Sequence, residues 1–249
     1  MTRYDSRKDV EPSWGPGYGV SVAEAPAETR ASFIGKTYLH VAGAVFALVG
    51  LEALLFAIVP QTTQVRILSV LGNTPMLWFL VLGAFMFVSV IADRTARSPA
   101  GPPMHYVGLA LYVVAEALIL FPMLALANLY SPEGTIASAA VVTLLMFGGL
   151  TAFVLLTRMN FSWLGGLLSV GFWAALAVIA AGLLFGFNFG LWFIVPMIAL
   201  ACGSILYQTS NLMHVYQPGQ HVAAALALFA SVALLFWYVL QLLMSLQRD

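Results

Sequence analysis

Long apolar runs alternate with short polar connections along most of the chain. Seven runs are long enough to cross a bilayer as helices, which requires about 20 predominantly apolar residues. They cover residues 38–59, 76–92, 104–129, 135–157, 163–185, 189–213 and 221–246. Within each run the hydropathy is continuous and does not alternate, which predicts helices and excludes the strands of a membrane barrel. The pattern therefore predicts an all-α integral membrane protein, with a seven-helix transmembrane domain at residues 33–249.

The N-terminal segment, residues 1–32, is a polar tail that lacks the apolar core of a cleavable signal peptide. Such a composition cannot bury enough apolar surface to fold alone, which favours disorder. The alternative is a segment that becomes ordered on a partner, with Trp14 and Tyr18 as its anchoring side chains. Composition does not choose between these two interpretations.

Composition agrees with a membrane location, because 61% of the residues are hydrophobic and 8% are charged. Soluble domains have about 25% charged residues. Ten basic and ten acidic residues give a net charge of zero, so no basic face is available for nucleic acid. The single cysteine, Cys202, excludes a disulfide framework, and His214 and His221 flank a turn without a third metal ligand. We therefore expect no nucleic acid partner, no metal and no other cofactor.

The positions of Lys and Arg predict the orientation, because cytoplasmic loops of membrane proteins are enriched in both. With the N-terminus inside, eight of the ten basic residues lie on the inner side. The inner residues are Arg3, Arg7, Lys8, Arg30, Lys36, Arg94, Arg97 and Arg158, and the outer ones are Arg66 and Arg248. This bias predicts a cytoplasmic tail and a C-terminus on the outer side.

Polar side chains inside the spans are the candidate functional residues, because ionisable groups are costly there. Glu116 lies near the middle of the third run and Glu52 in the outer half of the first. No Lys or Arg lies centrally in any run, so we expect both carboxyl groups to be neutral. Each acid either forms a hydrogen bond between packed helices or handles a proton or cation. Gln208 and Asn211 share a helix face and either cap the helix end or line a wet cavity.

Five segments, in this order, resemble motifs of the Bax inhibitor (transmembrane Bax-inhibitor-motif) family of seven-span proteins. They are residues 33–38 (FIGKTY), 114–124 (VAEALILFPML), 157–166 (TRMNFSWLGG), 205–209 (ILYQT) and 221–236 (HVAAALALFASVALLF). The third segment is similar to the family's T-K-x-D-F-S-x-L-G-G and is the most persuasive of the five. The resemblance covers residues 33–246 and implies a bundle of the Bax inhibitor type.

The departures from the family pattern concern its acidic residues. Members that leak calcium are thought to use two aspartates, one in each of the last two spans, as a proton-sensitive gate. The matching positions here are Gln208 and Ser231, which do not ionise, and a loop aspartate is replaced by Asn160. Because calcium prefers several carboxylate oxygens, the resemblance does not imply calcium gating in this chain. Glu116 does match the family's glutamate.

These departures lead to two hypotheses for a protein without the motifs of membrane enzymes. The first is a non-enzymatic accessory or regulatory subunit in a bacterial inner membrane, in contact with a larger membrane protein assembly or a membrane protease. The alternative is a leak channel for protons or calcium that uses Glu116, Gln208, Asn211 and Ser231. Convergence of Glu116, Gln208 and Ser231 on one cavity would indicate that the family's site is kept in an uncharged form. If these three residues lie apart, the accessory-subunit hypothesis is favoured.

Overall fold

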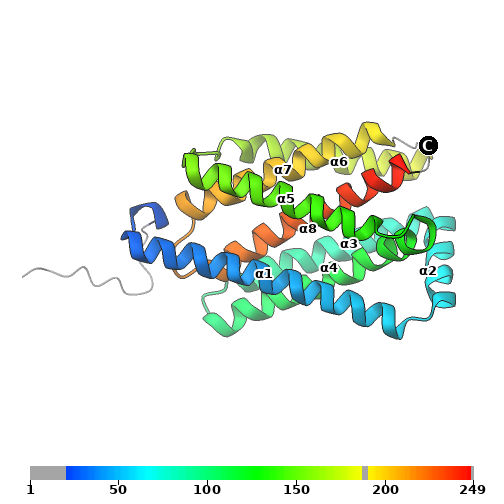
Figure 1. Ribbon diagram of the computed structural model, residues 1–249, viewed down its shortest axis with the longest axis horizontal. Coiled ribbons are helices and arrows are strands. Elements are labelled where there is room, and N and C mark those ends of the chain that lie inside the picture. The colour runs from blue at the N-terminus through cyan, green and yellow to red at the C-terminus, as the bar shows by residue number, and fades with distance from the viewer. Residues whose placement is uncertain (1–20, 187–189, 248–249) are drawn as a thin grey trace, which may run out of the picture.

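The described part of the chain is helical, as the apolar runs predict. The computed structural model describes residues 21–186 and 190–247, which form one 3-10 turn, eight α-helices and no strand (Figure 1). In chain order these are η1 (Val22–Glu24), α1 (Ala27–Ile58), α2 (Gln61–Asn73), α3 (Pro75–Ala96), α4 (Pro102–Tyr130), α5 (Thr135–Thr157), α6 (Leu164–Phe185), α7 (Leu191–His214) and α8 (His221–Leu246). All except η1 and α2 are long and apolar enough to cross a membrane, which confirms the prediction of a seven-span all-α protein.

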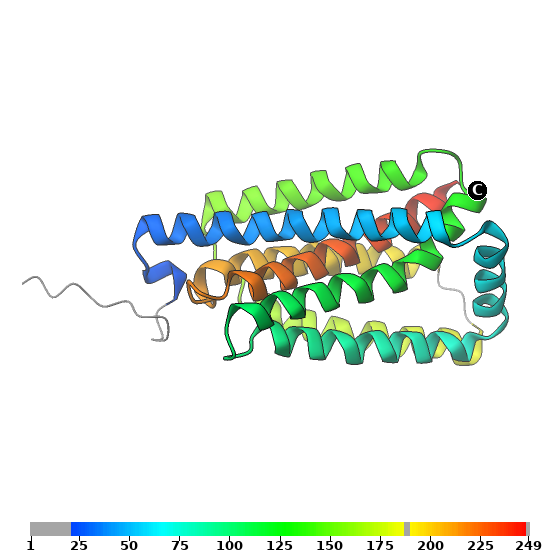
Figure 2. The ribbon, with the colours of Figure 1, turned by 90° about the horizontal axis from the view of Figure 1, so that it is seen from below.

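Helix α8 forms the centre of the bundle and packs against α1, α3, α4, α5 and α7. Its sequence is apolar on every side, a pattern typical of a helix that is buried all round. Leu228, Leu235 and Leu240 have no exposed surface. Figures 1 and 2 show α8 crossing the middle of the bundle, with the other spans around it.

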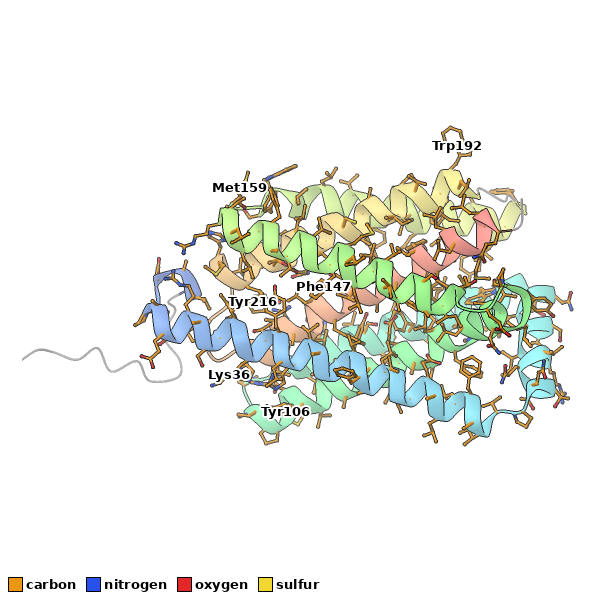
Figure 3. All side chains as sticks on the ribbon, in the orientation of Figure 1. Lys36, Tyr106, Phe147, Met159, Trp192 and Tyr216 are labelled. Carbon is orange, nitrogen blue, oxygen red and sulfur yellow. The ribbon has the colours of Figure 1, made fainter. Side chains whose placement is uncertain are left out.

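The outer faces of the spans are apolar, in contrast to the surface of a soluble protein. Phe46 of α1 is 77% exposed and Leu156 of α5 is 82% exposed. Trp192, which is 91% exposed, stands away from the bundle near the start of α7 (Figure 3). An apolar outer surface of this kind is stable only when lipid covers it.

The two ends of the bundle differ in structure. The turn η1 and the connections 97–101, 158–163 and 215–220 lie at one end of the bundle, the η1 end (Figure 1). At the α2 end, α2 lies across the axes of the spans and joins α1 to α3 (Figure 2). Helix α1 begins at the η1 end and α8 ends at the α2 end, as an odd number of crossings requires.

The helix boundaries differ from the apolar runs at the N-terminal side. Helix α1 begins at Ala27, before the predicted domain start at residue 33, because residues 27–37 continue the helix beyond its apolar part. Val22 of η1 is fully buried, so the last residues of the predicted polar tail pack on the bundle. The short helix α2, between Pro60 and Pro75, is an element that the apolar runs do not predict.

Candidate functional site

A pocket of about 590 Å³ lies inside the bundle, between α3, α4, α6, α7 and α8. We call it the Glu116 pocket. Its polar side chains include three of the residues singled out in the sequence, namely Glu116, Gln208 and Ser231, together with Ser204 and Tyr112. The pocket extends from these residues, near mid-bundle, towards the α2 end, where Trp78 and Gln241 line it. Glu116, Gln208 and Ser231 therefore converge on one cavity.

Glu116 lies on α4 one turn after Tyr112, and 6% of it is exposed. Tyr112 and Glu116 both line the pocket, and their side chains are close enough to interact. The Tyr112 ring is held edge-to-face by Phe85 at 5.9 Å and by Phe229 at 6.0 Å between centroids. A protonatable carboxyl thus lies beside a hydroxyl group whose ring is fixed by packing.

Ser231 connects α8 to α7 through its hydroxyl group. Its hydroxyl donates to the Ala227 carbonyl at 3.0 Å and lies 2.8 Å from the Ser204 hydroxyl. Because the single Ser231 proton points to Ala227, the Ser204 hydroxyl is the donor between the two serines. The position therefore forms a neutral contact between helices on the wall of the pocket.

The other predicted residues lie elsewhere. Asn211 is buried but does not line the pocket, and its backbone carbonyl accepts hydrogen bonds from Val215 and Tyr216 at the end of α7. Glu52 is 7% exposed and lines a separate groove beside α1. It is still close enough to Glu116 for two negative charges on these residues to repel each other. Trp14 and Tyr18 fall outside the described residues.

The η1 end is closed by a cluster around Tyr216, which the sequence analysis missed. The Arg97 guanidinium donates to the Tyr216 hydroxyl at 3.2 Å and to the Asp93 carboxylate at 2.8 Å, and lies 5.5 Å from the centre of the Tyr216 ring. The backbone N–H of Val22 donates to the Tyr216 carbonyl at 3.0 Å. Burial raises the pKa of the Tyr216 hydroxyl, and the nearby Arg97 only partly opposes this effect. No local pattern links Arg97 with Tyr216, because 119 residues separate them.

The loop between α5 and α6 is fixed by amide and hydroxyl groups. The Asn160 side-chain oxygen accepts from the Ser162 N–H at 2.9 Å, and the Ser210 hydroxyl accepts from the Phe161 N–H at 2.9 Å. Asn160 therefore shapes the turn before α6. Ser210, in the polar group at the end of α7, anchors this loop to α7.

Among the residues that the structure describes, no group of three His, Cys, Asp or Glu side chains could hold a metal ion. His221 contacts His40 at 5.1 Å between ring centroids, and the His214 ring nitrogen bonds to the Ser210 carbonyl at 2.9 Å. Both histidines thus have neighbours within the bundle that account for their positions. The Glu116 pocket consequently offers one carboxyl group, the amide groups of Gln208 and Gln241, and several hydroxyl groups.

Comparison with known proteins places the chain among proteins of this architecture. It is 32% identical to Bax inhibitor 1 of Schizosaccharomyces pombe over 69% of this chain and 64% of the yeast protein. It is 26% identical to protein lifeguard 4 of Mus musculus over 93% of this chain and 92% of the mouse protein. An uncharacterised protein of Pseudomonas aeruginosa is 34% identical over 45% of this chain and 51% of its own length. No solved structure matches the chain significantly.

A family model described as "Inhibitor of apoptosis-promoting Bax1" matches residues 30–248, which include every span and the whole Glu116 pocket. The match agrees with the resemblance of the five sequence segments and with the seven apolar helices. The chain belongs to the Bax inhibitor family of membrane proteins.

Proposed function

We propose that this protein is a non-enzymatic membrane protein that transfers protons through the Glu116 pocket. The observation that supports the proposal is the convergence of Glu116, Gln208 and Ser231 on one cavity. The pocket is lined mainly by apolar side chains but contains several buried polar ones. Ionisable groups inside a membrane bundle are costly, and they mark ion or proton pathways in membrane proteins. Glu116 is the one carboxyl group among the described residues that line the pocket.

The chemistry of the pocket favours a proton over calcium. Calcium takes six to eight oxygen ligands and prefers carboxylates. The walls here offer one carboxyl, the Gln208 amide and hydroxyl groups such as those of Ser204 and Tyr112. A single carboxyl with hydroxyl neighbours is sufficient to accept and release a proton.

The lining of the pocket extends towards the α2 end, whereas Arg97, Tyr216 and Val22 form a hydrogen-bonded cluster at the η1 end. For protons to cross the membrane through the pocket, we expect the Arg97–Tyr216 contact to separate.

Proton flux into proteoliposomes that contain a pH-sensitive dye tests the proposal, with potassium and valinomycin to compensate charge. The wild-type protein should exceed empty vesicles, and Glu116→Gln should fall to their level. Glu133→Gln, which changes an exposed carboxyl in the α4–α5 connection, is the matched control and should behave as wild type. Equal flux for wild type and Glu116→Gln would overturn the proposal.

The second candidate function is an accessory subunit, supported by the anchoring of η1. Val22 fixes the chain to the 215–220 connection at the η1 end. Trp14 and Tyr18 precede Val22 in the sequence and remain the candidate anchoring residues for a partner. Purification of tagged protein in mild detergent tests this function. A membrane protein that co-purifies with wild type and is lost from the Trp14→Ala/Tyr18→Ala variant supports it, and a lone monomer contradicts it.

We also infer that the η1 end faces the cytoplasm of a bacterial inner membrane. Among the described residues, Arg30, Lys36, Arg94, Arg97 and Arg158 lie at this end, and Arg66 is the one basic residue at the α2 end. The distribution follows the enrichment of Lys and Arg in cytoplasmic loops. In a Cys202→Ser background, an impermeant thiol reagent added to whole cells should label Gly72→Cys at the α2 end and not Ser98→Cys at the η1 end. The reverse pattern would contradict this orientation.

A further inference from the structure

A second hollow, which we call the Glu52 groove, lies between α1 and α5 and encloses about 790 Å³. Helices α4 and α8 form its floor, through residues such as Leu120 and Phe236. It lies on the opposite face of α8 from the Glu116 pocket, since Phe229 and Val232 line the groove whereas Ala230 and Ser231 line the pocket. Its volume is in the range of pockets that bind small organic molecules.

The groove opens sideways, towards the space that lipid fills. Its rim includes Phe46 and Val49 of α1, which are 77% and 59% exposed, and Leu144 of α5, which is 54% exposed. Phe147 points from α5 towards α1 and lies 6.2 Å from the Tyr38 ring between centroids (Figure 3). A molecule dissolved in the bilayer can therefore enter between α1 and α5 without passing through water.

Three polar side chains that line this apolar groove have buried oxygen atoms without a hydrogen-bond partner. These atoms are both carboxyl oxygens of Glu52 and the hydroxyl oxygens of Thr143 and Tyr38, and only 7% of Glu52 and 2% of Thr143 are exposed. Glu52 lies six residues before the end of α1, and Thr143 eight residues after the start of α5. Buried polar groups are normally paired, so unpaired ones that line a cavity indicate a missing ligand.

We propose that the Glu52 groove binds a lipophilic amine from the bilayer, with its nitrogen against Glu52 and its apolar part along the aromatic floor. An ammonium group has three N–H donors and no acceptor. Four unpaired oxygen atoms belong to residues that line the groove, two on Glu52 and one each on Thr143 and Tyr38, and Glu52 alone offers two acceptors to one ammonium group. An alcohol has one donor and leaves the remaining oxygens unpaired, whereas an acyl chain pairs none of them.

Charge complementarity also favours an amine. The ionisable group that interacts electrostatically with Glu52 is Glu116, which is also acidic. Among the described residues, no Lys or Arg lines the groove. An amine that enters in its neutral form accepts the proton of the Glu52 carboxyl. This transfer forms an ammonium–carboxylate pair and conserves charge. The ring of Phe56, one helical turn after Glu52, lines the groove and can add a favourable contact for a cation.

The test uses the full chain in lipid nanodiscs and a long-chain primary amine that contains a photoreactive diazirine. Intact-mass spectrometry measures labelling, and peptide mapping locates it. We expect labelling of α1 and α5, competition by the plain amine, and about tenfold weaker competition by the alcohol of equal chain length. Equal competition by alcohol and amine would overturn the proposal and leave the groove as a site for lipid tails.

Variants separate this site from the Glu116 pocket. Glu52→Gln keeps the shape of the side chain and should weaken amine labelling about tenfold. Ala140→Phe, which fills the groove from α5, should abolish labelling even if Glu52→Gln folds poorly. Glu116→Gln should keep amine labelling while proton flux is lost, so the two proposals fail independently. Unchanged labelling in folded Glu52→Gln would contradict the amine site.

Discussion

The Ser204 hydroxyl of α7 lies 2.8 Å from the Ser231 hydroxyl of α8, and Ser231 in turn donates to the Ala227 carbonyl. The pair lies on the wall of the Glu116 pocket. Two serines can pair with each other and with the backbone, so no charge is needed to satisfy them. The two hydroxyl groups thus form a neutral, hydrogen-bonded contact between the helices.

A double-mutant cycle of Ser204→Ala and Ser231→Ala measures the strength of this contact. Hydrogen bonds between membrane helices contribute about 0.6 kcal/mol on average and about 1.7 kcal/mol at most. We expect a coupling free energy in this range for unfolding in a detergent series. Ser169→Ala on the exposed side of α6 is the control and should not couple with Ser231→Ala. A coupling free energy of zero would show that the two hydroxyls do not bond in the membrane.

Restoring two carboxylates should give the pocket an affinity for calcium that the natural chain lacks. The variant Gln208→Asp/Ser231→Asp places two acids beside Glu116 in the same cavity. Calcium should then raise the melting temperature, because a ligand that binds only the folded state stabilises it. The wild-type protein should show no calcium-dependent shift in the same detergent. A shift of equal size in both proteins would contradict our interpretation of the site.

The sequence predicts the spans well because bilayer thickness imposes a minimum length on each apolar run. It predicts the helix ends less well, since α1 continues back to Ala27 through residues that are helical but not apolar. Helix α2 is missed because its polar residues, such as Gln61 and Gln64, resemble those of a connection. Helix α2 lies across the end of the bundle (Figure 2), and the sequence pattern does not predict this position.

The candidate site could be predicted only in part. The sequence identifies Glu116, Gln208 and Ser231 as intramembrane polar residues at positions that resemble family motifs. Helical periodicity does not predict that they line one pocket, because they lie on three different helices. The Glu52 groove depends on how α1 and α5 both pack against α8 without closing on each other. The contact between Arg97 and Tyr216 likewise depends on tertiary structure alone. Such relationships arise from packing and are absent from local sequence patterns.

The close approach of α3 and α4 depends on Gly108. A Cβ atom at this position would lie 2.5 Å from the Ala92 carbonyl oxygen and 2.5 Å from the Ala96 nitrogen, both of which are backbone atoms. Gly108→Ala should therefore lower the free energy of unfolding by about 1–3 kcal/mol, the usual effect of overpacking. Gly83→Ala is the matched control on α3, where a Cβ would meet no atom within 4 Å. If Gly108→Ala were as stable as Gly83→Ala, the helices would be further apart than the structure places them.

The closed η1 end should open in alkaline solution, because burial raises the pKa of Tyr216 above its ordinary value of about 10. Tyr216 is neutral in the folded state, and its contribution to stability is complete below the ordinary pKa. The contribution is lost as the pH rises through the higher pKa of the folded state, since the unfolded chain ionises first. Tyr216→Phe removes the bond with Arg97, which contributes about 1 kcal/mol at neutral pH, and also removes this alkaline loss.

Melting temperatures of wild type and Tyr216→Phe, measured from about pH 7 to about pH 11, test this prediction. Wild type should be the more stable protein at neutral pH, and the difference should shrink above about pH 10. Tyr130→Phe, which changes a tyrosine that is 63% exposed at the end of α4, should follow wild type throughout. A constant difference between wild type and Tyr216→Phe would mean that the Tyr216 hydroxyl does not titrate within the closed end. In that case alkaline pH would not open the path through Arg97 and Tyr216.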